Sequence, residues 1–276
     1  MNLDDLSEEH HKARSRFVRK LVQQPYDTNI RSSVYAKKPP LKIVQFWDRL
    51  DNLPEDVQEC MATWKKVEEQ GIERTLFGKQ HARDFIFDNL GKRHLTAFDK
   101  CYHPAMQSDY FRLSYLFVKG GCYIDTDDVY SGVEIQHFFN DGLLKIQPLC
   151  YDKATSSMVS PLIFTKSGAD NDSWIFYFNN NPLITSREHP IIERALTHAT
   201  LLLERATTKQ LPEIQSTTGP GNLSKSIFDI VSQNPEMAYT LSVLCNWENI
   251  AKSKWDLSYR NDSRNWRYSN CVKYQG

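Results

Sequence analysis

The chain has 276 residues and a formal net charge of zero, with 40% hydrophobic and 25% charged residues, an ordinary globular composition. This charge balance argues against a nucleic-acid partner held mainly through phosphate contacts, because such binding needs a strongly basic surface. No stretch approaches the ~20 consecutive apolar residues of a membrane-spanning helix, so we predict no membrane span.

Residues 3–24 are predicted to form a charged amphipathic helix, with acidic residues first and basic residues later, an order that suits the helix dipole. Two interpretations stay open for it. The helix contacts a membrane surface peripherally, or it is a solvated helix that packs through Phe17, Leu21 and Val22. Pro25 ends it, and a linker follows.

We therefore predict an N-terminal helical extension and linker over residues 1–38. A single domain follows over 39–276, with a C-terminal loop region over its site. The six cysteines form no C-x-x-C pair, and the first residues are charged rather than apolar. A cytoplasmic protein is expected from both observations.

Strands and helices alternate along the first half of the domain, which favours an α/β fold with a mostly parallel central sheet. The predicted strands are 41–47, 72–77, 122–125, 143–150, 160–166 and 173–179. The predicted helices are 54–70, a helix within 79–90, 104–119, 190–206 and 222–231.

Acidic residues cluster directly after the short apolar strand at 122–125. Residues two apart in an extended segment point the same way, so Asp125 and Asp127 can converge on one point while Asp128 need not. Two carboxylates at the carboxyl end of a strand suit a hard cation such as Mg²⁺ or Mn²⁺. The alternative is an acidic turn with no ligand.

The helix before this strand adds a second polar pair. Asp109 and Arg112 stand three positions apart and therefore share one helical face. Gly120 and Gly121 turn the chain from the helix into the acidic strand, which can bring both residues near the carboxylates. The alternative is a surface ion pair of little energetic value.

The string SDYFRLSYLFVKGGCYIDTDD at 108–128 resembles the sugar-binding DXD region of glycosyltransferase family 32. It is also similar, more distantly, to the glucosylating domain of large clostridial cytotoxins. PPLKIVQFW, NNNPLITSREHPIIERAL and TTGPG follow in the order expected for the family. The resemblance implies a GT-A-type nucleotide-sugar-binding sandwich with helical additions.

The resemblance also implies a role for each matching residue. Asp125, Asp127 and Arg112 would be the catalytic residues, and Asp127 and Asp125 would bind the metal, with Asp262 as the candidate third ligand. The candidate donor-binding residues are Trp47, Asp109, Arg112, Asp125, Asn180 and Trp266.

Two further residues have structural alternatives. His189 belongs to the site or starts a helix, and Thr218 is expected to cap the helix that follows it.

The function implied is metal-dependent, retaining transfer of a hexose from a UDP- or GDP-sugar to an acceptor, with Mn²⁺ or Mg²⁺ as cofactor. A saccharide acceptor is favoured, and a protein acceptor is the alternative. Two functions of other classes stay open: a two-carboxylate glycoside hydrolase and a non-catalytic carbohydrate- or calcium-binding module. Release of a nucleoside diphosphate distinguishes the transferase from both.

Overall fold

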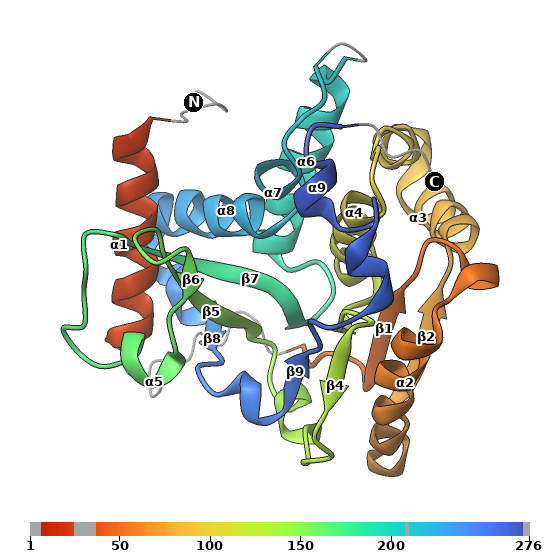
Figure 1. Cartoon of the computed structure of the whole chain (residues 1–276), viewed down its shortest axis with the longest axis horizontal. Coiled ribbons are helices and arrows are strands. Elements are labelled where there is room, and N and C mark those ends of the chain that lie inside the picture. Colours follow the sequence, from red (N-terminus) through yellow and green to blue (C-terminus); the bar gives the residue numbers. More distant parts are fainter. Residues whose placement is uncertain (1–6, 25–36, 208–209, 273–276) are drawn as a thin grey trace.

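The structure is a computed structural model that describes residues 7–24, 37–207 and 210–272, and every statement below concerns these residues. Figure 1 shows a sheet surrounded by helices. The α-helices are α1 (Glu8–Gln23), α2 (Glu55–Thr63), α3 (Lys79–Asp99), α4 (Pro104–Lys119), α5 (Pro161–Phe164), α6 (Pro190–Arg205), α7 (Ile214–Thr217), α8 (Pro220–Gln233) and α9 (Trp266–Ser269).

The strands are β1 (Lys42–Phe46), β2 (Glu73–Phe77), β3 (Gly121–Tyr123), β4 (Asp128–Tyr130), β5 (Leu144–Asp152), β6 (Ser157–Met158), β7 (Trp174–Thr185), β8 (Leu241–Val243) and β9 (Ala251–Ser253). Short 3₁₀ helices lie at η2 (Leu50–Asn52), η3 (Trp64–Gln70), η4 (Gln136–Phe139), η5 (Pro235–Thr240), η6 (Trp247–Asn249) and η7 (Ser258–Asn261).

The central sheet has the strand order β2-β1-β3-β7-β5-β6, and β8 pairs with β5. Strands β2, β1, β3, β5 and β8 run in one direction, whereas β7 and β6 run the opposite way. A separate two-stranded sheet joins β4 to β9. The α/β class and the mostly parallel direction of the central strands are therefore confirmed.

Alternate residues of the sheet face two different cores. Val44 and Tyr123 belong to the larger core, which the helices α4, α6 and α8 cover, while Ile43 and Cys122 belong to a second core that contains Trp64. The sheet is thus buried on both faces, as expected for an α/β sandwich.

Helix α1 packs against β7 and α8. Its apolar stripe contributes Val18, Leu21 and Val22 to the larger core, and Ser15 Oγ accepts a hydrogen bond of 2.9 Å from Phe176 N. The apolar face that a membrane-surface helix would insert is therefore used within the protein. The linker predicted after Pro25 lies largely outside the described residues.

One predicted strand is wrong. Residues 160–166 were expected to extend, but Pro161–Phe164 forms the short helix α5. Ser160 caps this helix by accepting from Leu162 N, and proline suits its first turn. Leu162 is 79% exposed, so the apolar residues of this stretch do not form a buried strand.

The turn from α4 into β3 depends on two glycines. Gly120 and Gly121 have φ angles of 69° and 104°, which side chains with a Cβ rarely adopt. A Cβ on Gly120 would lie 2.7 Å from Arg187 N, and one on Gly121 would lie 2.8 Å from Lys42 O. This tight passage sets α4 beside the strand that ends at the acidic residues.

No helix within the described ranges is both long and apolar enough to cross a membrane.

Candidate active site

Asp125 follows β3 and is fixed through its backbone from two neighbouring strands. Asn181 Oδ1 of β7 accepts from Asp125 N at 3.0 Å, and Gln45 Nε2 of β1 donates to Asp125 O at 3.3 Å. Its carboxylate faces a cavity and accepts a hydrogen bond of 2.7 Å from Arg112. Burial raises the pKa of Asp125 to about 6 although Arg112 lowers it, and the charge of Asp127 adds to the rise.

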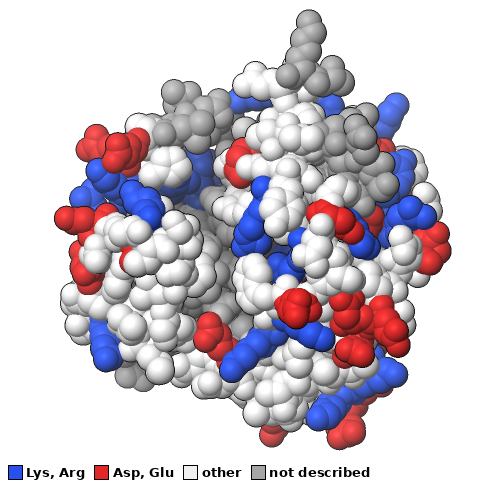
Figure 2. All heavy atoms as spheres, in the orientation of Figure 1, with Lys and Arg blue, Asp and Glu red and all other residues white. Residues whose placement is uncertain are grey.

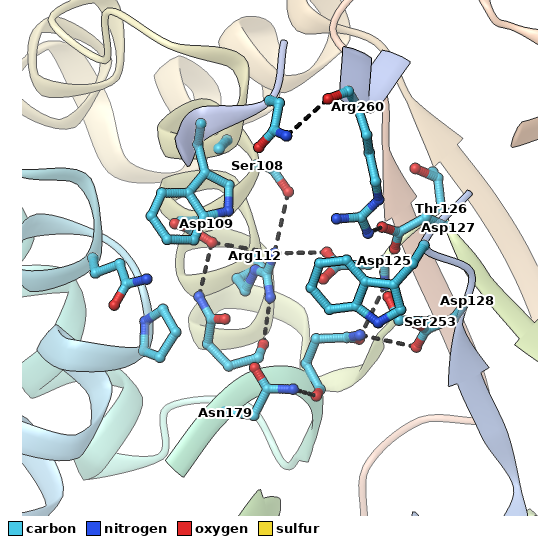
Figure 3. Close-up of a pocket in the computed structure, with 18 of the residues that line it drawn as sticks. Ser108, Asp109, Arg112, Asp125, Thr126, Asp127, Asp128, Asn179, Ser253 and Arg260 are labelled. Atoms are coloured by element: carbon cyan, nitrogen blue, oxygen red, sulfur yellow. Dashed lines mark hydrogen bonds and ion pairs between the residues drawn. The ribbon is translucent and has the colours of Figure 1, made fainter. Parts of the chain in front are cut away.

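Arg112 of α4 lies at the centre of this arrangement (Figure 3). Its guanidinium contacts the carboxylates of Asp125 and Asp109 at 2.7 and 3.2 Å and stacks over the Tyr123 ring at 4.3 Å. Only 3% of its side chain is exposed. Burial, the largest single effect, lowers the pKa of Arg112, but the surrounding groups, Asp125 first and then Tyr123 and Asp109, together raise it, so the guanidinium stays charged.

Asp109 is oriented by residues that lie far away in sequence. Asn180 Nδ2 donates to Asp109 Oδ1 at 2.8 Å, and the Thr218 hydroxyl donates to Asp109 Oδ2 at 3.3 Å. The expectation that Thr218 caps a helix is therefore wrong, and Gly219 holds the N-cap position of α8. A Cβ on Gly219 would meet Asp109 Oδ2 at 3.2 Å, so the glycine lets the turn approach the acid closely.

Asp127 points toward the C-terminal segment rather than toward α4. Tyr259 OH donates to its Oδ2 at 2.8 Å, and Arg260 forms an ion pair with the same oxygen. Figure 3 shows the Arg260 side chain extending to Asp127, while Asp109 lies on the other side of Arg112. Asp128 lies on β4 and accepts from Asn181 Nδ2 at 2.9 Å, and burial followed by the charges of Asp127 and Asp125 raises its pKa.

These groups line a cavity of about 650 Å³. Figure 2 shows it as a hollow in the visible face, with basic side chains on its wall. Of the candidate donor-binding residues, the structure brings all to this cavity: Trp47, Asp109, Arg112, Asp125, Asn180 and Trp266. That size suits a ligand larger than a single sugar ring.

The two tryptophans are held differently. Trp47 is only 8% exposed and packs edge-on against Tyr259, with ring centroids 5.4 Å apart. Trp266 is partly buried against the larger core, and the Arg267 guanidinium lies 4.7 Å from its ring centroid. Each tryptophan thus presents only part of its ring to a ligand.

Asp262 is not brought together with the other acids. It lines a neighbouring cavity and forms an ion pair of 2.6 Å with Arg264. Within the described part of the chain, no group of three or more His, Cys, Asp or Glu side chains is arranged to hold a metal. Asp262 therefore lies apart from Asp125 and Asp127, which line the larger cavity.

The residues around Asp125 and Asp127 nevertheless fit a divalent cation. The charge of Asp127 raises the pKa of Asp125, and the guanidinium of Arg260 already forms an ion pair with Asp127. Mg²⁺ is commonly bound by one or two carboxylates together with substrate phosphates and water. Two acids beside a large cavity match that ligand set.

Tyr259 and Arg260 were not predicted as site residues, since nothing in the local sequence signals a contact between Arg260 and Asp127, which are 133 positions apart. Asn181 belongs to a run of three asparagines before a proline, a pattern that allows a sugar contact or an ordinary loop. His189, in contrast, starts a helix: its side chain accepts from Ile191 N at the first turn of α6. It does not line the cavity.

Comparisons with known proteins agree with this geometry. Residues 34–132 match the family model described as "Glycosyltransferase sugar-binding region containing DXD motif". The chain is also similar to a solved structure titled "PaToxG Glycosyltransferase", with 15% identity, a TM-score of 0.50 and coverage of 96% of this chain and 97% of that chain. At that identity the likeness shows the fold. No curated protein matches the chain.

The sandwich and its cavity, together with these matches, define a glycosyltransferase of the GT-A type. Within that class the chain carries the DXD sugar-binding region, in which Asp125 and Asp127 are the two acids.

Proposed function

We propose that the protein transfers a hexose from a UDP- or GDP-sugar to an acceptor, with retention of configuration and with Mn²⁺ or Mg²⁺ as cofactor. The observation that carries this proposal is the buried array of Asp109, Arg112 and Asp125 at the wall of a 650 Å³ cavity. A buried array that turns charged and polar groups into a cavity is suited to binding the hydroxyl groups of a sugar.

Asp125 and Asp127 are the residues that would hold the cation. A cation held there would act as a Lewis acid and neutralise negative charge on the departing diphosphate. The role of the protein is to keep both carboxylates in place, and the backbone bonds of Asp125 to Gln45 and Asn181 do this from two strands.

Asp109, Arg112 and Asn180 would orient the donor sugar. Asp109 keeps its orientation through Asn180 and Thr218, and Arg112 keeps its charge because both Asp125 and Asp109 lie beside it. Trp47 would contact the base with its exposed edge, and Trp266 would lie against the donor from the C-terminal segment. Preorganised groups of this kind lower the barrier because they need not reorient during the reaction.

In the transfer step, the bond between the sugar C1 and the diphosphate oxygen breaks, and a bond forms between C1 and an acceptor hydroxyl. The nucleoside diphosphate departs with the bonding electrons, and its oxygen takes up the proton of the acceptor hydroxyl. We propose a saccharide acceptor, and a protein acceptor is the alternative. The buried free thiols of Cys60, Cys101 and Cys122 suit a reducing cytoplasmic location.

The test is to incubate the protein with a panel of nucleotide sugars and Mn²⁺ and to measure release of nucleoside diphosphate. We expect slow hydrolysis of one donor class, abolished in Asp127→Asn and retained in Arg93→Gln, which removes a surface ion pair with Glu204. Saccharides and proteins added separately show which acceptor accelerates release. If no donor is cleaved under any condition, the binding-module alternative is favoured instead.

A further inference from the structure

The guanidinium groups of two arginines in the C-terminal segment stack on the ring of one tryptophan at the cavity wall. The guanidinium carbon of Arg260 lies 4.4 Å from the ring centroid of Trp255, and that of Arg267 lies 4.8 Å from it. All three residues line the cavity. Stacking on an aromatic face holds a guanidinium in place without neutralising its charge.

Arg260 faces the site with only part of its hydrogen-bonding capacity used. It pairs with Asp127, and 14% of its side chain is exposed. Its Nε is buried and has no hydrogen-bond partner among the described residues. Its main-chain oxygen accepts from Asn265 Nδ2 at 2.8 Å, so its backbone is fixed while its guanidinium has a donor to spare.

Arg267 has no carboxylate partner within the described part of the chain. Burial lowers the pKa of Arg267, and the nearby positive charge of Arg260 lowers it further. Two like charges held near each other at a cavity wall are unfavourable unless an anion binds between or beside them. The wall is therefore suited to a negatively charged ligand group.

Two different positive charges, the guanidinium of Arg260 and a bound cation, would compete for the carboxylate of Asp127. Its Oδ2 accepts hydrogen bonds from Arg260 and Tyr259. A cation held by Asp125 and Asp127 would compete with the guanidinium for the same carboxylate. Once displaced, Arg260 would have no acid partner at the site, just as Arg267 has none.

We propose that Arg260 is an exchangeable counter-ion: it neutralises Asp127 in the free protein and moves to the donor diphosphate, beside Arg267, when the cation takes Asp127. This proposal rests on the proposed function. The diphosphate is the anion that arrives together with the cation, and a guanidinium binds phosphate oxygens through two parallel hydrogen bonds. Arg260 thereby couples occupation of the metal site to binding of the leaving group.

The exchange predicts effects of opposite sign for one substitution. Arg260→Gln removes the competitor for Asp127, so Mn²⁺ alone binds more tightly, by about three- to tenfold. The same variant has lost a phosphate ligand, so UDP, GDP and inorganic pyrophosphate bind about ten- to a hundredfold more weakly at saturating Mn²⁺. A purely structural role predicts weaker binding of both kinds of ligand.

The experiment is calorimetric titration of the full chain with Mn²⁺ alone and then, at saturating Mn²⁺, with UDP, GDP and pyrophosphate. Arg267→Gln should weaken only the phosphate ligands, and Arg260→Lys should fall between wild type and Arg260→Gln because it keeps the charge but loses the fork. Arg93→Gln is the control of equal charge change outside the cavity. Circular dichroism confirms that each variant is folded.

Two outcomes overturn the exchange while the proposed function stands: Mn²⁺ binding that is unchanged or weaker in Arg260→Gln, or unchanged phosphate binding in both arginine variants. If the wild-type protein binds neither UDP nor GDP with Mn²⁺, the proposed function itself fails, and the exchange fails with it. Should Arg260→Gln be unfolded, tighter Mn²⁺ binding by Arg260→Lys still supports the exchange, and its absence contradicts it.

Discussion

Replacing Arg112 by lysine tests whether the fork geometry of the guanidinium, rather than its charge, organises the site. The guanidinium contacts Asp125 at 2.7 Å, Asp109 at 3.2 Å and the main-chain oxygen of Asn180. A lysine ammonium is a point charge and cannot span all three acceptors. At least one charge-assisted hydrogen bond and one buried acceptor lose their partner, which costs about 2–4 kcal/mol of stability.

For a chain of this length the stability loss corresponds to a fall in Tm of about 3–7 °C. We also expect kcat/KM for donor hydrolysis to fall at least about a hundredfold, because Asp125 and Asp109 are no longer held in one geometry. Scanning calorimetry and a coupled assay of nucleoside diphosphate release measure the two effects. Arg93→Lys is the matched control, since it alters a surface pair with Glu204. Unchanged Tm and turnover in Arg112→Lys would refute the organising role.

Three further predictions concern single positions. Asp127→Asn should abolish donor hydrolysis, because the neutral amide cannot balance the charge of a cation. Circular dichroism should show that the fold is kept. Near-normal turnover would contradict the role of Asp127 as a cation ligand. Gly219→Ala should cost about 1–3 kcal/mol in chemical denaturation and reduce turnover, because its Cβ crowds Asp109; an unchanged midpoint counts against the close approach.

The pKa of His189 is lowered from 6.5 to about 4 by burial and then by the charge of Lys145. The unfolded chain therefore takes up a proton that the folded chain excludes, and stability falls by roughly 3 kcal/mol as the pH drops from 6.5 to 4. His189→Asn keeps a capping acceptor, so denaturation curves across this range should show a weaker pH dependence, and an equal dependence would contradict it.

The parts of the fold set by local sequence were predictable. Helix α4 begins at Pro104 and ends at Lys119, as expected from the proline at its start and the glycine pair after it. The acids after β3 were also found, because their spacing and their place at a strand end are local properties. The pairing of Asp109 and Arg112 followed from helical geometry alone.

The parts set by distant contacts were not predictable. The hydroxyl of Thr218 reaches Asp109 across 109 positions, and no periodicity encodes that approach. Strand β9 has three residues and exists because β4 supplies hydrogen-bond partners to it. The short run PLIF was misassigned because four apolar residues fit a strand or a helix equally, and the cap at Ser160 decides between them.

The packing of α1 has a consequence for how the chain is made. Ser15 meets Phe176, 161 positions later, and the helix also lies against α8, which begins at Pro220. At synthesis rates of about 5–20 residues per second, α1 leaves the ribosome on the order of ten seconds or more before α8 exists. Until β7 and α8 are made, its apolar stripe of Val18, Leu21 and Val22 lacks the surface that covers it in the folded protein. Helix α1 therefore docks only after much of the chain that follows it has been made, because β7 and α8 together form the surface on which it packs.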